Sequence, residues 1–169
     1  MTRADLLRCL CSFLEDATKD LIMPVALQKN DVENGVPVQK YSPAKIYPMR
    51  LPNGSDLTKI TPYILVRVIH GDDVQKQGED PEATAVIRMT FTVYNKDEPE
   101  GEMMLLNLIE RVRIALLKAV VIGKLYTLDL SDGLSFDVYD GIKAPYYAGE
   151  MVTTWQLPPI EREDVLKWL

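Results

Sequence analysis

The chain has few histidine and cysteine residues, two residue types that are common in catalytic and metal sites. It has one histidine, His70, and two cysteines, Cys9 and Cys11, among 169 residues. A single imidazole excludes a metal site built on several histidines, and any nucleophilic triad would depend on that one side chain. A Gly-Asp-Asp run follows His70, so we expect a loop histidine beside turn-forming acids. The cysteines are two positions apart in a segment that reads as helix, which favours two reduced thiols and an intracellular place of synthesis.

Clustered positive charge and phosphate-binding loops are also missing. The formal net charge is −6, and the lysines and arginines are scattered singly, whereas binding to a phosphate backbone needs a cluster of them. No GxGxxG or Walker-type loop joins a strand to a helix. No run approaches the roughly 18 apolar residues of a membrane span, and Asp5 and Arg8 interrupt the first apolar stretch within a few residues. We therefore expect no specific nucleic acid, no cofactor, no membrane insertion and no signal peptide.

One acidic segment is a candidate for binding a hard cation. Its carboxylates are Asp72, Asp73, Glu79, Asp80 and Glu82. Ca²⁺ and Mg²⁺ bind carboxylate oxygens, but the spacing is not that of an EF-hand loop, and we interpret the segment as a solvated loop. The sequence thus predicts no catalytic, cofactor-binding or metal-ligating residue and a protein that is not an enzyme. The alternative of an enzyme or small-molecule-binding domain would gain support from a deep pocket that gathers His70 with several carboxylates.

What the sequence does contain is the composition of an ordinary folded protein, with 47% hydrophobic and 26% charged residues. A chain of this length suits one domain with one sizeable core. We expect a single domain over residues 1–169, with an extended arm or loop at 30–62 and a C-terminal tail at 160–169.

Two segments have helical periodicity. The first begins with a capping box at Thr2 and Asp5 and continues to about Pro24. The second follows the acidic stretch from Asp97 to Glu102, which we expect to favour helix initiation, and is apolar on two sides. Its main stripe comprises Leu105, Leu108, Ile109, Val112, Ala115, Leu116 and Ala119, and its second strip comprises Met103, Leu106, Ile114 and Leu117. A helix apolar on two sides covers two partners, and we expect a sheet as one and the first helix or a neighbouring subunit as the other.

Alternation of apolar and polar residues predicts the strands. We expect strands at 64–69, 84–94 and 150–157, with the second of them long and central, and a hairpin formed by 125–130 and 134–139 around a Ser-Asp-Gly turn. The fold class is therefore α+β. The aromatic side chains Tyr146, Tyr147 and Trp155 lack the flanking bases of a nucleobase platform, so we interpret them as core or interface residues. For Trp168, packing on its own chain and packing on another chain remain open.

The segment at 30–62 has no clear periodicity. Its prolines are Pro37, Pro43, Pro48, Pro52 and Pro62, and Asn53-Gly54 is a turn signal. A stretch of this length without periodicity is uncommon in a compact domain and is either functional or packed on a neighbour. We expect the arm, roughly Val32 to Lys59, and the loop Gly71 to Pro81 to project from the sheet.

Three stretches follow one another in a set order. They are the strand Ala85 to Tyr94 leading into an acidic turn, the helix LLNLIERVR from Leu105 to Arg113, and the run PYYAGEMVTTWQLP from Pro145 to Pro158. Together they resemble the tail-terminator or tail-completion proteins of long-tailed phages and prophages. The resemblance covers about the C-terminal two-thirds of the chain and consists of structural residues.

The resemblance implies a twisted, largely antiparallel sheet with two main helices on it, in a virion protein assembled as a hexameric ring. Such a ring caps the tail tube and helps join the tail to the head. The implied partners are other copies of the chain, the tail tube protein and a head–tail connector, and the implied place is the tail or neck of a virion assembled in the bacterial host cytoplasm. A head–tail connector or neck adaptor is the alternative role. The family has no catalytic residues to transfer.

Overall fold

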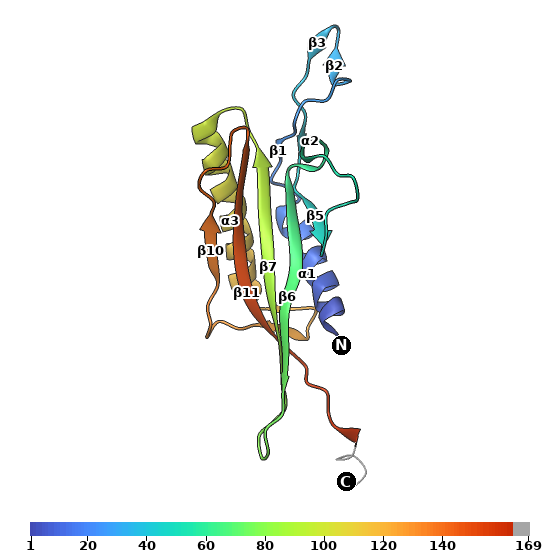
Figure 1. Cartoon of the computed structure of the whole chain (residues 1–169), viewed down its shortest axis with the longest axis vertical. Helices are drawn as coiled ribbons and strands as arrows, with labels where there is room; N and C mark the ends of the chain where they lie inside the picture. The colour runs from blue at the N-terminus through green and yellow to red at the C-terminus, as the bar shows by residue number, and fades with distance from the viewer. Residues whose placement is uncertain (164–169) are drawn as a thin grey trace.

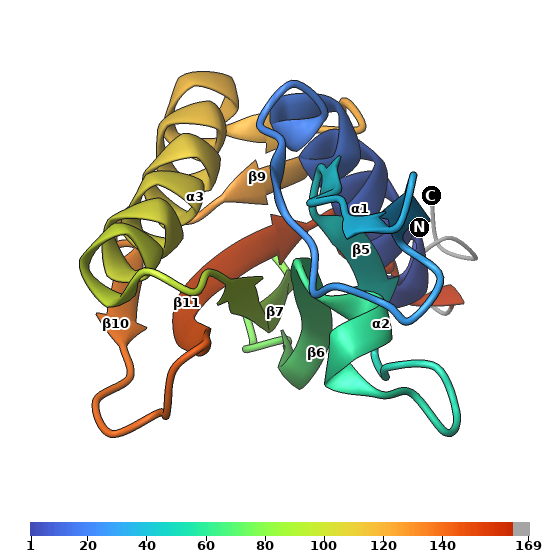
Figure 2. The same ribbon diagram turned by 90° about the horizontal axis from the view of Figure 1, so that it is seen from above.

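Three long strands form the centre of the molecule, and the computed structural model describes them together with the rest of residues 1–163. They are β6 (Tyr63–Val74), β7 (Glu82–Tyr94) and β11 (Tyr146–Leu157). Helices α1 (Arg3–Thr18) and α3 (Glu98–Ala119) lie side by side on one face of the resulting sheet (Figures 1 and 2). The predicted α+β fold is confirmed.

The sheet is antiparallel except at one edge. Its order is β5-β6-β7-β11-β9-β8, with β10 also pairing with β11. The shorter strands are β5 (Lys45–Pro48), β8 (Val121–Ile122), β9 (Tyr126–Leu128) and β10 (Ser135–Val138). Strand β5 runs parallel to β6, and Met89 of β7 lies between Val66 of β6 and Met151 of β11. The predicted central position of β7 is confirmed.

The hairpin predicted over 125–139 is wrong. Strands β9 and β10 do not pair with each other; each pairs with β11 at a different height, through Trp155↔Leu128 and Met151↔Phe136. The long β11 has room on one edge for two short strands in succession. Asp129 holds the connection by accepting hydrogen bonds from the backbone N–H and the hydroxyl of Ser131. The chain does turn at Ser131 to Gly133 as predicted, but this turn connects two strands, β9 and β10, that both pair with β11.

Helix α1 forms because its start is capped and one side is apolar. The backbone N–H of Asp5 donates to the Thr2 hydroxyl at 3.2 Å, and the Thr2 N–H donates to the Asp5 carboxylate at 3.0 Å, so the predicted capping box is confirmed. The helix ends at Thr18, earlier than predicted, where the hydroxyl donates to the Leu14 carbonyl oxygen at 2.8 Å.

Helix α3 begins at the N-cap Asp97, whose carboxylate accepts from the N–H of Glu100. Its predicted main stripe faces the sheet, where Leu105, Leu108, Ile109, Val112 and Leu116 are buried. Gly101 lets the helix approach β11, because a Cβ at this position would overlap the ring of Tyr147. The close approach seals the core at the end of α3 nearest to Tyr147.

Strands β6 and β7 extend past the helices as a two-stranded ribbon, which we call the β6–β7 ribbon (residues 69–83), seen at the lower end of Figure 1. The predicted loop from Gly71 to Pro81 is therefore too long, since pairing continues to Val74↔Glu82. Arg3 of α1 holds the ribbon, and its guanidinium donates to the carbonyl oxygens of Thr84 and Asp72 at 2.8 Å each. Because α1 supplies these contacts from outside the sheet, period-2 alternation did not reveal the extra length.

The segment predicted as an arm is divided. Strand β1 (Met23–Pro24) pairs with β4 (Tyr41–Ser42), and β5 joins the main sheet beside β6. The short helix α2 (Leu57–Ile60) follows β5. The part between β1 and β4 stands off as the hairpin of β2 (Val32–Glu33) and β3 (Val36–Pro37), at the upper end of Figure 1. Asn34 and Gly35, at φ +51° and +80°, make its two-residue turn.

Replacing Gly101 with alanine is expected to destabilise the fold, against the usual helix preference. Alanine normally stabilises a helix interior relative to glycine by about 1 kcal/mol. Here the added methyl group meets the Tyr147 ring, and overpacking costs about 1–3 kcal/mol. Urea unfolding of Gly101→Ala measures the effect, with Glu100→Ala on the exposed side of the same turn as the control. A gain in stability for Gly101→Ala would contradict the close approach.

Candidate functional site

The single histidine lies on the β6–β7 ribbon, which projects beyond the helices. His70 is part of β6 and not of a loop, and its Nε2 is 2.9 Å from a carboxylate oxygen of Asp72. Both side chains are about three-fifths exposed, at 59% and 61%. His70 lines none of the main pockets of residues 1–163, so these pockets do not bring it together with several carboxylates.

The acidic residues of the ribbon do not converge on one point. Asp73 pairs with Arg3 at 2.9 Å, and Glu79 pairs with Lys76 at 3.5 Å. Across the described part of the chain, no group of three or more histidine, cysteine or acidic side chains has an arrangement that could hold a metal ion. These carboxylates give the projecting ribbon negative charge without forming a ligand set.

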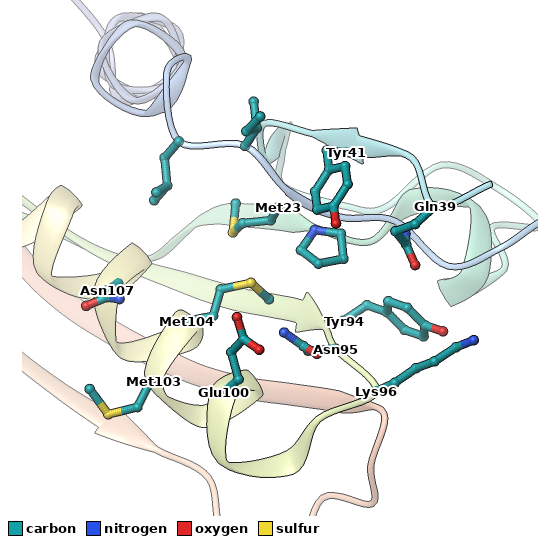
Figure 3. A pocket seen from close by; sticks show the side chains of 13 residues that line it. Met23, Gln39, Tyr41, Tyr94, Asn95, Lys96, Glu100, Met103, Met104 and Asn107 are labelled. Atoms are coloured by element: carbon teal, nitrogen blue, oxygen red, sulfur yellow. The ribbon is translucent and has the colours of Figure 1, made fainter.

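One surface hollow is an open groove of about 440 Å³, which we call the β1 groove. It lies between the segment that contains β1, the strand end at Tyr94, and the first turns of α3 (Figure 3). Its apolar wall includes Ile22, Tyr41 and Met103, which are among the most exposed large hydrophobic side chains of the structure. Lys96 and Glu100 stand at its margin. A shallow methionine-containing groove of this kind suits a flexible apolar contact.

The second apolar strip predicted on α3 remains uncovered. Met103 is 57% exposed, Ile114 is 42% exposed and Leu117 is 37% exposed. At 100° per residue the strip lies opposite the stripe that faces the sheet, so neither the sheet nor α1 covers it. We call these three residues and the half-buried Leu106 the α3 strip.

A bidentate ion pair sits in the middle of the α3 strip. Both nitrogens of the Arg113 guanidinium that face Glu110 donate to its carboxylate, at 2.7 and 3.0 Å. This contact lowers the pKa of Glu110 and raises that of Arg113. Because the two charges neutralise each other along one helix, the strip can be covered without leaving an unpaired charge.

The uncovered face of the sheet has mixed chemistry. Tyr146 lies there beside Tyr94, with ring centroids 5.6 Å apart, whereas Tyr147 and Trp155 point into the core, as interpreted from the sequence. Glu150 accepts a hydrogen bond from the Tyr139 hydroxyl at 2.8 Å and lies 3.2 Å from Arg88 Nε. The pKa of Tyr139 is raised, chiefly by burial and then by this carboxylate.

The β2–β3 hairpin is anchored at its base and bare at its tip. Asp31, nearly buried, accepts from the N–H of Gln28 at 2.9 Å and pairs with Lys40. Beyond this anchor, Val32 and Val36 are 47% and 62% exposed. This hairpin was not predicted, although Asn34-Gly35 between Glu33 and Val36 is a strong hairpin signal.

Comparison with known proteins adds no family assignment: no family model matches the chain, and no curated protein matches it. The phage resemblance therefore stays a prediction. Within residues 1–163, no helix is long and apolar enough to cross a membrane. Trp168 and most of the predicted tail lie outside the described residues.

The anchor at Asp31 is expected to make the hairpin sensitive to acid. The hydrogen bond from Lys40, followed by that from Gln28, holds the pKa of Asp31 below its usual value of 3.8. A carboxyl with a lowered pKa in the folded state stabilises above its unfolded pKa, and this contribution is lost as the pH falls through the folded value. The methyl resonances of Val32 and Val36 should therefore shift in a transition below pH 3.8.

The matched variants are Asp31→Asn and Glu33→Gln. The first should abolish the transition, because the titrating group is gone. The second should leave it in place, because Glu33 lies on the hairpin but outside the anchor. A transition that persists in Asp31→Asn would assign it to another carboxyl and refute the anchoring role.

Proposed function

We propose that the chain is a structural subunit of tail-terminator type, which forms a ring with copies of itself, caps a phage tail tube and helps join the tail to the head. The proposal combines the resemblance of residues 85–158 to that family with the surplus apolar surface of the folded chain. Under this proposal the chain acts by binding other proteins. Its partners are further copies of the chain, the tube protein and a head–tail connector.

The observation that carries the proposal is the uncovered α3 strip. Single exposed apolar residues are ordinary on protein surfaces, but a row along one side of a helix is not. The row is formed by Met103, Leu106, Ile114 and Leu117, opposite the buried stripe. A surface of this kind is the usual mark of a protein–protein contact, and it supports assembly as the activity of the chain.

The two ends of the molecule support a role between two partners. The β2–β3 hairpin projects at one end of the long axis, and the β6–β7 ribbon projects at the other (Figure 1). An isolated two-stranded hairpin is marginally stable in water, so both projections gain from contact with another protein. A ring that stands between a tube and a head needs a contact surface at each end.

Loss of the gene is expected to give overlong tails or tails without heads. Electron microscopy of particles made with and without the gene measures tail length and the fraction of tails joined to heads. Overlong tails support termination, and tails of normal length without heads support the neck-adaptor role instead. Particles that are normal without the gene would remove both roles.

Purified tubes provide the matching biochemical test. The chain added to tubes that lack it should bind at one end only and stop further growth, because a terminator contacts the terminal tube ring. A Leu117→Asp variant, which places a charge in the uncovered strip, should fold normally but lose this capping, since ring closure needs the strip. The control is Val121→Asp, which changes an exposed apolar residue outside the strip.

A further inference from the structure

The α3 strip has a counterpart on the opposite flank of the same chain. There, β5 and the C-terminal half of α1 enclose an open groove of about 400 Å³, which we call the β5 groove. Its floor is apolar, formed by Pro43, Ala44, Ile46 and Tyr47. Helix α3 and strand β10 lie at one flank of the molecule, and α1 and β5 lie at the other (Figures 1 and 2).

The β5 groove has an exposed lysine at its margin, and the α3 strip has an exposed glutamate beside it, so the two surfaces can form an ion pair. Lys45 projects from β5 and is exposed, and its ammonium group donates to the carbonyl oxygen of Lys59 at 3.1 Å, with no carboxylate partner among residues 1–163. Lys19 and Glu15 stand on the α1 side, where Lys19 pairs with Asp16. Glu102 lies on the first turns of α3, beside the apolar strip, and is exposed.

The wider flanks differ in charge in the same sense. Residues 97–143, which include α3 and β10, carry nine acidic and five basic side chains, a net charge of −4. Residues 3–62, which include α1, β5 and α2, carry seven acidic and eight basic side chains, a net charge of +1. Opposite charge on two surfaces favours the encounter between them and fixes their orientation.

We propose that the α3 strip of one copy packs into the β5 groove of the next copy, so that the two flanks form the repeated contact of the ring. The inference rests on the proposed function and names its self-contact. Two different patches of one chain make a heterologous interface, which closes into a ring when the rotation between copies permits. The contact leaves the uncovered sheet face and both projecting ends free for other partners.

Disulfide trapping tests the contact directly. A chain with Met103→Cys and Lys45→Cys has one thiol on each flank, so mild oxidation should convert the monomer band into a ladder of linked copies. The trap is placed in a Cys9→Ser background. Burial raises the pKa of the remaining Cys11 to about 11, so little of it is thiolate at neutral pH. Oxidation is carried out on the purified chain and on assembled tails.

The control cysteine variants show which two surfaces meet between copies. The single variants Met103→Cys and Lys45→Cys should stay monomeric, and a dimer of Met103→Cys alone would show an α3–α3 contact and overturn the proposal. The pair Met103→Cys and Val36→Cys places the second thiol on the hairpin tip and should give no ladder. The absence of a ladder from the first pair, both in solution and on tails, also overturns the proposal.

Charge exchange gives an independent readout. Glu102→Lys and Lys45→Glu should each weaken association in sedimentation experiments, and the double variant should recover it, because each interface then regains an opposite pair. Failure of the double variant to recover counts against the proposal. A ladder together with normal particles in the absence of the gene would refute the tail function alone. Defective tails without a ladder would refute this interface alone.

Discussion

The structure depends on the pairing of three long antiparallel strands, of which one face is covered by helices and the other is not. Successive side chains of a strand point to opposite faces, so the apolar set of β7 that includes Ile87, Met89 and Phe91 fills the core under α1 and α3. The same alternation places Arg88, Thr90 and Thr92 on the uncovered face. The strands are longer than the helical layer, and the ribbon that overhangs follows from this mismatch.

Each of the helices α1 and α3 packs on the sheet with one side only. In α3, the close contact of Gly101 with Tyr147 and the buried stripe fix the orientation of the helix about its own axis. Once that orientation is set, the residues on the opposite side have no partner within the described chain. The exposed strip is therefore a consequence of how the core is packed. Its exposure cannot be relieved by a small rotation of the helix, because rotation would expose Leu108 and Val112 instead.

The sequence revealed the periodic parts of the fold and missed the parts that depend on contacts across the chain. The N-terminal capping box of α1, the buried stripe of α3 and the central β7 follow local rules, and all three were predicted. The ribbon length was missed because Arg3, some seventy positions away, holds it. The pairing of β9 and β10 was missed because a turn signal tells where the chain bends and not which strand it then meets.

The two candidate contact surfaces differ in how far the sequence predicted them: the α3 strip was predicted, and the β5 groove was not. Helical spacing alone separated the two apolar sides of α3, and the structure shows which of them is left uncovered. The β5 groove had no signal, since it joins α1 to a strand that lies within a proline-rich segment without periodicity. Its two walls become neighbours only because β5 runs parallel to β6 and is carried to the sheet edge beside α1.

A parallel edge strand also explains why the two flanks differ. Strand β5, which carries Lys45, forms the sheet edge beneath α1. The opposite edge is formed by β8 at one height and by β10 at another, where β10 lies below the acidic start of α3. A sheet with two unlike edges cannot make the same contact twice by a two-fold rotation unless one flank is left unused. Copies that join one flank to the other, as we propose, follow one another in a single direction, and a closed ring of such copies would leave neither flank exposed.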